Sequence, residues 1–102
     1  MDMVDKFSIP DDHPSLQGHF PGDPIAPGVV ILNEVIGLIE KNLTNRVVVG
    51  VKSVKFIKPV HAGKEMLLHL DEKKLNSLNI LCEHNGDVYV KGQLVLSSKD
   101  VV

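Results

Sequence analysis

The sequence of 102 residues lacks several features that would point to particular functions. Its one cysteine, Cys82, excludes a disulfide within the chain, and the apolar residues 78–81 before it predict a small buried side chain. It has no tryptophan, and aromatic residues make up only 4% of the chain. Its 11 basic and 13 acidic residues give a formal charge of -2 and form no polybasic stripe, so we expect no nucleic-acid partner.

Membrane and targeting signals are also missing. Residues 1–6 are acidic and mixed in character, unlike the basic start and apolar run of a signal peptide. No later apolar run reaches the length that spans a bilayer. We therefore expect a cytoplasmic protein that has no membrane partner.

Metal and nucleotide motifs are missing as well. The 5 histidines are dispersed over different predicted loops and strands, without the His-Glu-x-x-His spacing and without a cysteine pair. The glycines do not form a Gly-x-Gly-x-x-Gly turn between a strand and a helix. We expect neither a metal nor another cofactor.

One segment has helical periodicity, from Gly28 to about Leu43, where apolar residues recur three or four positions apart. Its first turn, residues 29–32, is apolar on every side, which indicates that protein surrounds the start of the helix. The hydrophobic content of 43% suffices for one core, and we expect a single domain over residues 1–102.

Strands are predicted before and after this helix in the sequence, beginning with an extended segment at residues 4–9. Four β-rich segments follow the helix, at residues 46–57, 65–70, 77–83 and 88–97. The breaks between them are at residues 58–64, 71–76 and 85–87. Short turns between consecutive strands favour antiparallel pairing, so we expect an α+β fold in which an antiparallel β-sheet wraps around one central α-helix. The edges of such a sheet need cover, and the valine-rich residues 47–51 favour a dimer.

The most informative stretch is residues 19–30, His-Phe-Pro-Gly-Asp-Pro-Ile-Ala-Pro-Gly-Val-Val. Proline fixes φ, and glycine permits close backbone approach. Their clustering predicts that His19 and the first amides of the helix are held in a fixed relation. Acid/base chemistry requires such a fixed geometry.

Through this motif the chain resembles the hot-dog fold β-hydroxyacyl-acyl carrier protein dehydratases. The family pattern His-Phe-Pro-Gly-x-Pro-x-x-Pro-Gly-Val matches residues 19–29 throughout. A second family pattern, Phe-x-x-Pro-Val-x-x-Gly, matches residues 56–63. The two motifs occur in the family order, and the resemblance covers roughly the whole chain. It implies the hot-dog fold.

The resemblance also implies roles for individual residues. His19 would act at the carbon next to the thioester, and the amide of Gly28 would donate a hydrogen bond to the thioester carbonyl. Phe20, Pro27 and Val29 complete the implied substrate-binding set. The assignment is chemically reasonable, because removal of a proton beside a carbonyl builds negative charge on its oxygen, which a helix amino terminus stabilises.

One family element differs in this chain. The family carries a Glu or Asp on the helix, contributed across the dimer, which assists departure of the hydroxyl; counting from the motif proline places Asn33 there. Asparagine can orient a hydroxyl or a water, but it cannot donate a proton as a carboxylic acid does. Glu34 is the next residue, rotated by about 100° around the helix. We keep Asn33 and Glu34 as candidate catalytic residues.

The implied activity is dehydration of a 3-hydroxyacyl thioester, carried on acyl carrier protein or CoA, to a trans-2-enoyl thioester in fatty acid, lipid or polyene synthesis. Two alternatives stay open. A hot-dog thioesterase would use the same helix terminus to hold the carbonyl during hydrolysis. A catalytically degenerate subunit would bind acyl chains or complete the site of a partner, as the missing carboxylate at Asn33 suggests. The expected assembly is a homodimer or a heterodimer with a related hot-dog subunit, and a higher oligomer is left open.

Overall fold

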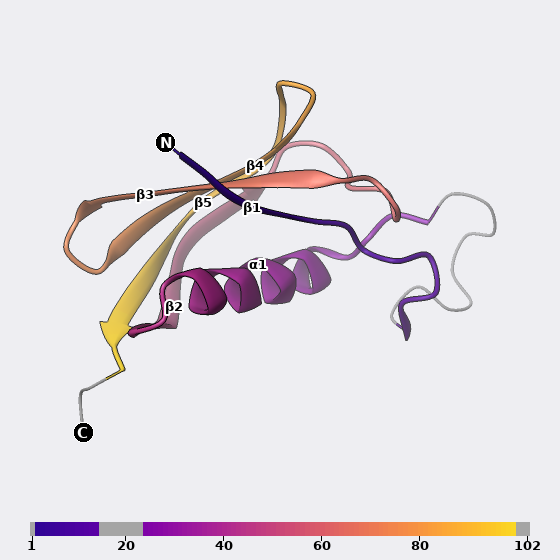
Figure 1. The fold of residues 1–102 in the computed structure, drawn as a ribbon. Helices are drawn as coiled ribbons and strands as arrows, with labels where there is room; N and C mark the ends of the chain where they lie inside the picture. Colours follow the sequence, from indigo (N-terminus) through magenta and orange to yellow (C-terminus); the bar gives the residue numbers. More distant parts are fainter. Residues whose placement is uncertain (1, 15–23, 100–102) are drawn as a thin grey trace.

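The computed structural model describes residues 2–14 and 24–99, in which one helix lies along one face of a curved sheet (Figure 1). In chain order the elements are β1 (Asp2–Phe7), α1 (Gly28–Asn42), β2 (Arg46–Phe56), β3 (Met66–Lys74), β4 (Ser77–His84) and β5 (Asp87–Ser98). The five strands follow the order β1-β3-β4-β5-β2, and every neighbouring pair is antiparallel. The expected hot-dog arrangement is confirmed, with β1 and β2 as the sheet edges.

The helix follows its apolar pattern closely. Ile31, Val35 and Ile39 are buried four residues apart and form the face of α1 that packs on the sheet. The amide of Leu43 donates to the carbonyl of Ile39 at 2.8 Å and closes the last turn. The predicted helix is therefore confirmed, and its last residue is Asn42.

Two strand boundaries were predicted wrongly. The break expected at residues 71–76 is mostly strand, because β3 continues to Lys74, which pairs with Ser77 of β4. Only Leu75 and Asn76 form the turn, and Asn76 has a positive φ of 63°, which asparagine adopts more readily than most residues. The polar residues that suggested a loop lie where the sheet extends into solvent. The first strand is also displaced: β1 spans Asp2–Phe7 rather than residues 4–9, and it pairs with β3.

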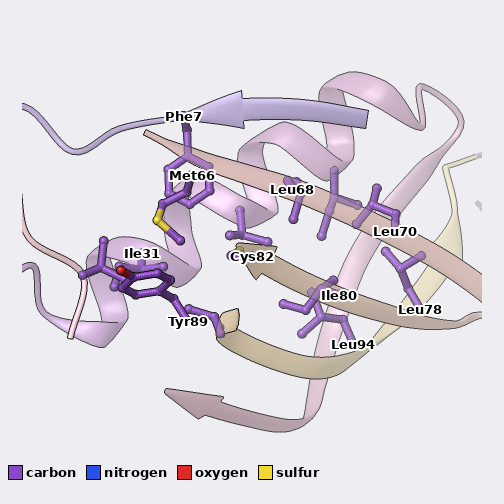
Figure 2. Packing of buried hydrophobic residues seen from close by; sticks show 14 of the residues in the cluster. Phe7, Ile31, Met66, Leu68, Leu70, Leu78, Ile80, Cys82, Tyr89 and Leu94 are labelled. Atoms are coloured by element: carbon purple, nitrogen blue, oxygen red, sulfur yellow. The ribbon is translucent and has the colours of Figure 1, made fainter. Parts of the chain in front are cut away.

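The core lies between α1 and the concave face of the sheet (Figure 2). All buried side chains among the described residues are hydrophobic, and the largest include Ile9, Ile39, Met66, Leu68, Leu78, Ile80, Leu94 and Leu96. Cys82 is completely buried among them, and this burial raises the pKa of its thiol to about 12. The prediction that it acts as a small apolar side chain is confirmed.

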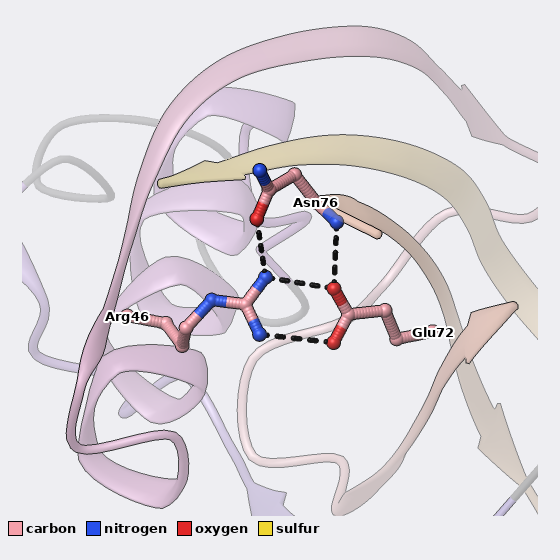
Figure 3. Close-up of polar contacts among 3 residues, drawn as sticks. All are labelled: Arg46, Glu72 and Asn76. Atoms are coloured by element: carbon pink, nitrogen blue, oxygen red, sulfur yellow. Dashed lines mark hydrogen bonds and ion pairs between the residues drawn. The ribbon is translucent and has the colours of Figure 1, made fainter. Parts of the chain in front are cut away.

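A polar cluster joins the start of β2 to the β3–β4 turn (Figure 3). Arg46 donates from its two terminal nitrogens to the carboxylate of Glu72 at 3.0 and 2.7 Å, and to the side-chain oxygen of Asn76 at 2.7 Å. The backbone amide of Asn76 donates to the same carboxylate at 2.8 Å. The hydrogen bond from Arg46 is the main cause that lowers the pKa of Glu72 from its ordinary value.

This cluster predicts a specific pH dependence of stability. Because the folded-state pKa of Glu72 lies below its unfolded value, its ionised form stabilises the fold above the unfolded pKa, and that contribution is lost as the pH falls through the folded pKa. Glu72→Gln should therefore lower the free energy of unfolding at about pH 7 and differ less from wild type at about pH 3. Urea unfolding at both pH values measures this, with Glu65→Gln, an exposed position, as the control. A Glu72→Gln defect that is the same at both pH values would contradict the assignment.

Candidate active site at the helix amino terminus

The two sequence motifs meet at the start of the helix. The amide of Ala26 donates to the carbonyl of Val60 at 2.8 Å, and the amide of Ala62 donates to the carbonyl of Pro24 at 2.9 Å. The two bonds form a short antiparallel bridge outside the main sheet. The second motif therefore fixes the segment that leads into α1.

The second motif is itself anchored to the core and to the amino-terminal segment. Val60 is almost fully buried. The amide of Gly63 donates to the carbonyl of Ile9 at 2.7 Å, and Gly63 has a φ of +85°, which residues with a side chain rarely adopt. The loop has little freedom to move away from the helix start.

The first turn of α1 presents unused backbone donors. Pro27 precedes the helix with extended backbone and gives no side-chain cap, and its carbonyl accepts hydrogen bonds from the amides of Val30 and Ile31 at 3.0 and 3.2 Å. The amides of Gly28 and Val29 have no acceptor among the described residues. No acidic residue lies in the first turn, so the positive end of the helix dipole is not neutralised there. A ligand oxygen would be stabilised at this position.

A cavity of about 330 Å³ opens beside these amides. It is lined by Ile25, Ala26, Gly28, Ile31, Phe56, Ile57, Lys58, Pro59 and Val60. The ring of Phe56 lies directly over Gly28: a Cβ atom added there would be 2.8 Å from the ring Cζ. The mostly apolar walls suit a hydrocarbon group, and the helix amides at one end suit a carbonyl oxygen.

Tyr89 fixes both ends of the loop that forms much of this cavity. Its backbone carbonyl accepts from the amide of Ile57 at 2.8 Å, and its hydroxyl lies 3.1 Å from Nζ of Lys64. Lys58, the one charged residue of the lining, has its ammonium 5.6 Å from the centre of the Tyr89 ring and 3.5 Å from a carboxylate oxygen of Asp87. Lys58 is therefore already paired.

The predicted binding residues are distributed unevenly around the cavity. Gly28 lines it, and Pro27 is the residue directly before the helix. Val29 is 64% exposed and is not part of the lining. His19 and Phe20 lie outside the described residues, so their roles remain predictions from the motif.

The two helix candidates lie away from the cavity of their own chain. Asn33 and Glu34 are both exposed on α1, and neither lines the cavity. Asn33 is one turn beyond Val29 and one turn before the exposed Gly37, so these three residues share one open face of the helix. Neither side chain is therefore placed to act in the cavity of its own chain.

The cavity walls include residues that sequence reasoning did not identify as site residues. Phe56, Ile57 and Lys58 belong to the second motif, which was available as a signal, but the position of that motif beside Gly28 emerges only from the fold. Tyr89 carries no sequence signal of this kind.

Two further features were sought in the part of the chain that the structure describes. It contains no cluster of three or more histidine, cysteine, aspartate or glutamate side chains that could hold a metal ion. None of its helices has the length and apolar character needed to cross a membrane.

Comparisons with known proteins agree with these motifs. The family model named ApeI-like, for the ApeI dehydratase, matches residues 2–93. A 3-hydroxyacyl-(acyl-carrier-protein) dehydratase FabZ of Nitratidesulfovibrio vulgaris is 36% identical over 95 residues, which cover 81% of this chain and 59% of that protein. The bifunctional enzyme LpxC/FabZ of Chlorobaculum tepidum is 32% identical over 102 residues, which cover 91% of this chain and 21% of that protein. The chain thus spans less than two thirds of either relative.

A solved structure shares the fold. The dehydratase heterocomplex ApeI:P from Xenorhabdus doucetiae contains a chain that superposes with a TM-score of 0.73 at 22% identity, covering 89% of this chain and 82% of that one. At this identity the likeness supports the arrangement of helix and sheet.

The contact between Gly28 and Phe56 yields a test of the site geometry. Gly28→Ala should lower the free energy of unfolding by about 1–2 kcal/mol, because the added methyl group must displace the ring. Gly37→Ala, on the same helix with no atom within 4 Å of the added Cβ, should raise it by up to about 1 kcal/mol.

Urea unfolding of the two variants, and of Gly28→Ala in a Phe56→Ala background, checks the cause. The penalty at position 28 should disappear when the ring is absent. A penalty that persists in that background would mean that the ring is not responsible.

Proposed function

Because the chain belongs to the ApeI-like dehydratase family, we propose that it removes water from 3-hydroxyacyl thioesters and forms trans-2-enoyl thioesters. The observation that carries this proposal is the first turn of α1, where the amides of Gly28 and Val29 have no acceptor among the described residues and Gly28 lines an apolar cavity. This turn follows the His-Phe-Pro-Gly motif closely in the sequence. The N. vulgaris relative is named for a substrate held on acyl carrier protein, and we propose the same class of substrate here.

In the proposed reaction, the imidazole of His19 removes a proton from the carbon between the thioester carbonyl and the hydroxyl-bearing carbon. Negative charge then develops on the carbonyl oxygen, where the Gly28 amide and the helix dipole stabilise it. The electron pair forms the new carbon–carbon double bond as the carbon–oxygen bond breaks. The imidazolium of His19 returns the proton it removed, directly or through a water, so the hydroxyl leaves as water and His19 is again neutral. No further reactant is consumed.

The site needs a second subunit in this proposal. Asn33 is exposed and faces away from its own cavity, so it would orient the departing hydroxyl, or a water, in the cavity of the partner. The edge strand β2 has a strand neighbour on one side only among the described residues, and its Val49 and Val51 are 60% and 48% exposed, so it offers a surface for association. The partner is either a second copy or a related hot-dog subunit, and the similar chain from X. doucetiae belongs to a heterocomplex.

A second candidate function follows from Asn33. Without a carboxylic acid at this position, the chain lacks the usual proton donor for the departing hydroxyl. It would then serve as the partner that completes the active site of a related dehydratase, while its own cavity holds the acyl chain.

Mass spectrometry of a short 3-hydroxyacyl group on acyl carrier protein tests the proposed reaction directly. The purified protein should cause loss of water and leave the thioester intact. His19→Ala should lower turnover by about 10²- to 10⁴-fold with unchanged thermal unfolding, because it removes the base. Release of the free acid would instead establish a thioesterase, and full turnover in His19→Ala would refute the assigned base.

Asn33→Glu separates the two candidate functions. If the rest of the site is intact, a carboxylic acid at this position should raise turnover about tenfold or more. Glu34→Gln is the matched control on the adjacent position and should leave turnover unchanged. A wild-type homodimer already as active as Asn33→Glu would exclude the partner-only function, and loss of turnover in Glu34→Gln would transfer the acid role to Glu34.

A further inference from the structure

Two lysines lie directly opposite each other on the sheet face that points away from α1. Lys55 of β2 pairs in register with Lys91 of β5. Their neighbours Val54 and Val90 pack against the core, so the alternation of side chains along a strand directs both lysines outward. Neither lysine has a carboxylate partner among the described residues. Like charges directly opposite each other disfavour pairing, and a bound anion would relieve this repulsion.

The lysines border a depression of about 460 Å³, which we call the outer groove. Its lining is Ser53, Val54, Lys55, Ile57, Asn79, Lys91, Gly92 and Gln93. The backbones of β2 and β5 come close together beside it. A Cβ atom added at Gly92 would be only 2.7 Å from the carbonyl oxygen of Ser53, which leaves no room for a side chain there. The lining thus combines two ammonium groups with neutral side chains that can donate and accept hydrogen bonds.

The surroundings keep this positive charge available. A second depression shares Asn79, Lys91 and Gly92 with the outer groove, and its lining includes one carboxylate, Asp71. That carboxylate has a cation of its own, since Lys73 lies 3.8 Å from it. The charge at Lys55 and Lys91 is therefore not neutralised from this side.

The outer groove adjoins the candidate active site. Ile57 lines both the outer groove and the cavity beside Gly28. Its amide is fixed by the hydrogen bond to the carbonyl of Tyr89, and its side chain is 45% exposed. The residue directly after β2 therefore borders both the apolar cavity beside Gly28 and the polar groove with two ammonium groups.

We propose that the outer groove binds the phosphate of the arm that carries the thioester. This inference rests on the proposed function, in which the thioester carbonyl is held at Gly28. Carrier-protein and CoA thioesters share an arm with a thioester at one end, amide groups along it and a phosphate at the other end. The apolar cavity beside Gly28 and the outer groove with its polar side chains and paired lysines meet at Ile57, so together they offer complementary groups to both ends of such an arm.

Binding of two matched probes tests the outer groove without any need for turnover. Phosphopantetheine and pantetheine differ only in the phosphate, and calorimetry should show that the wild-type protein binds the first about tenfold more tightly. Lys55→Gln/Lys91→Gln should reduce the difference to less than about twofold and leave pantetheine binding unchanged. Lys52→Gln, an exposed lysine on the same strand outside the lining, should keep the full difference.

Equal binding of the two probes by the wild-type protein, including no binding of either, would overturn the proposal. An equal loss in Lys52→Gln would also overturn it, because the effect would then reflect overall charge. A phosphate preference in a protein without dehydratase turnover would support the outer groove while rejecting the proposed function.

The source of the phosphate is resolved by comparing substrates. In an active protein, Lys55→Gln/Lys91→Gln should raise KM about tenfold, with little change in kcat. A rise with the CoA thioester alone assigns the groove to CoA, a rise with the carrier-protein thioester alone assigns it to the carrier arm, and a rise with both assigns it to the shared phosphate. Unchanged KM with both substrates would overturn the proposal.

Discussion

The candidate site depends on the short backbone bridge between residues 24–26 and 60–62. This bridge joins segments far apart in the sequence, so the start of α1 is placed by the sheet and not by the helix alone. Val60 lies in the core, and the amide of Gly63 donates a hydrogen bond to the carbonyl of Ile9. The bridge is therefore held in place by contacts with the rest of the fold. The donors of Gly28 and Val29 are thereby fixed before a ligand arrives, and preorganised donors of this kind stabilise developing charge most effectively.

Sequence reasoning identified the parts of this arrangement that depend on local chemistry. Proline and glycine spacing located the segment before the helix, and apolar periodicity located the helix itself. The sequence predicted a turn at residues 71–76 because the polar side chains there are typical of loops. In the structure β3 continues to Lys74, and its last residues are polar because they are exposed to solvent. Sequence reasoning could not identify Phe56 or Tyr89 as neighbours of the helix start, because their positions follow from strand pairing across the sheet.

The exposed face of α1 explains why a single chain is an incomplete enzyme in the proposed mechanism. Residues that bury their side chains on the sheet, such as Ile31 and Val35, leave Val29 and Asn33 facing outward. Asn33 therefore has no role in the cavity of its own chain, and in the proposed mechanism it acts in the cavity of the partner. The amide of Asn33 can orient a hydroxyl or a water, but it cannot donate the proton that a departing hydroxyl requires.

Successive side chains at the end of β2 point to opposite faces of the sheet. Phe56 points inward onto Gly28, and Lys55 points outward beside Lys91. The register of β2 against β5 is shifted twice, between Val48 and Gly50 and between Val51 and Ser53. Each shift adds one residue to β2 and reverses which side chains face the core, so the two together restore the original alternation. With only one of the two register shifts, Phe56 would face solvent and Lys55 would face Gly28. Both the apolar cavity and the outer groove would then be lost.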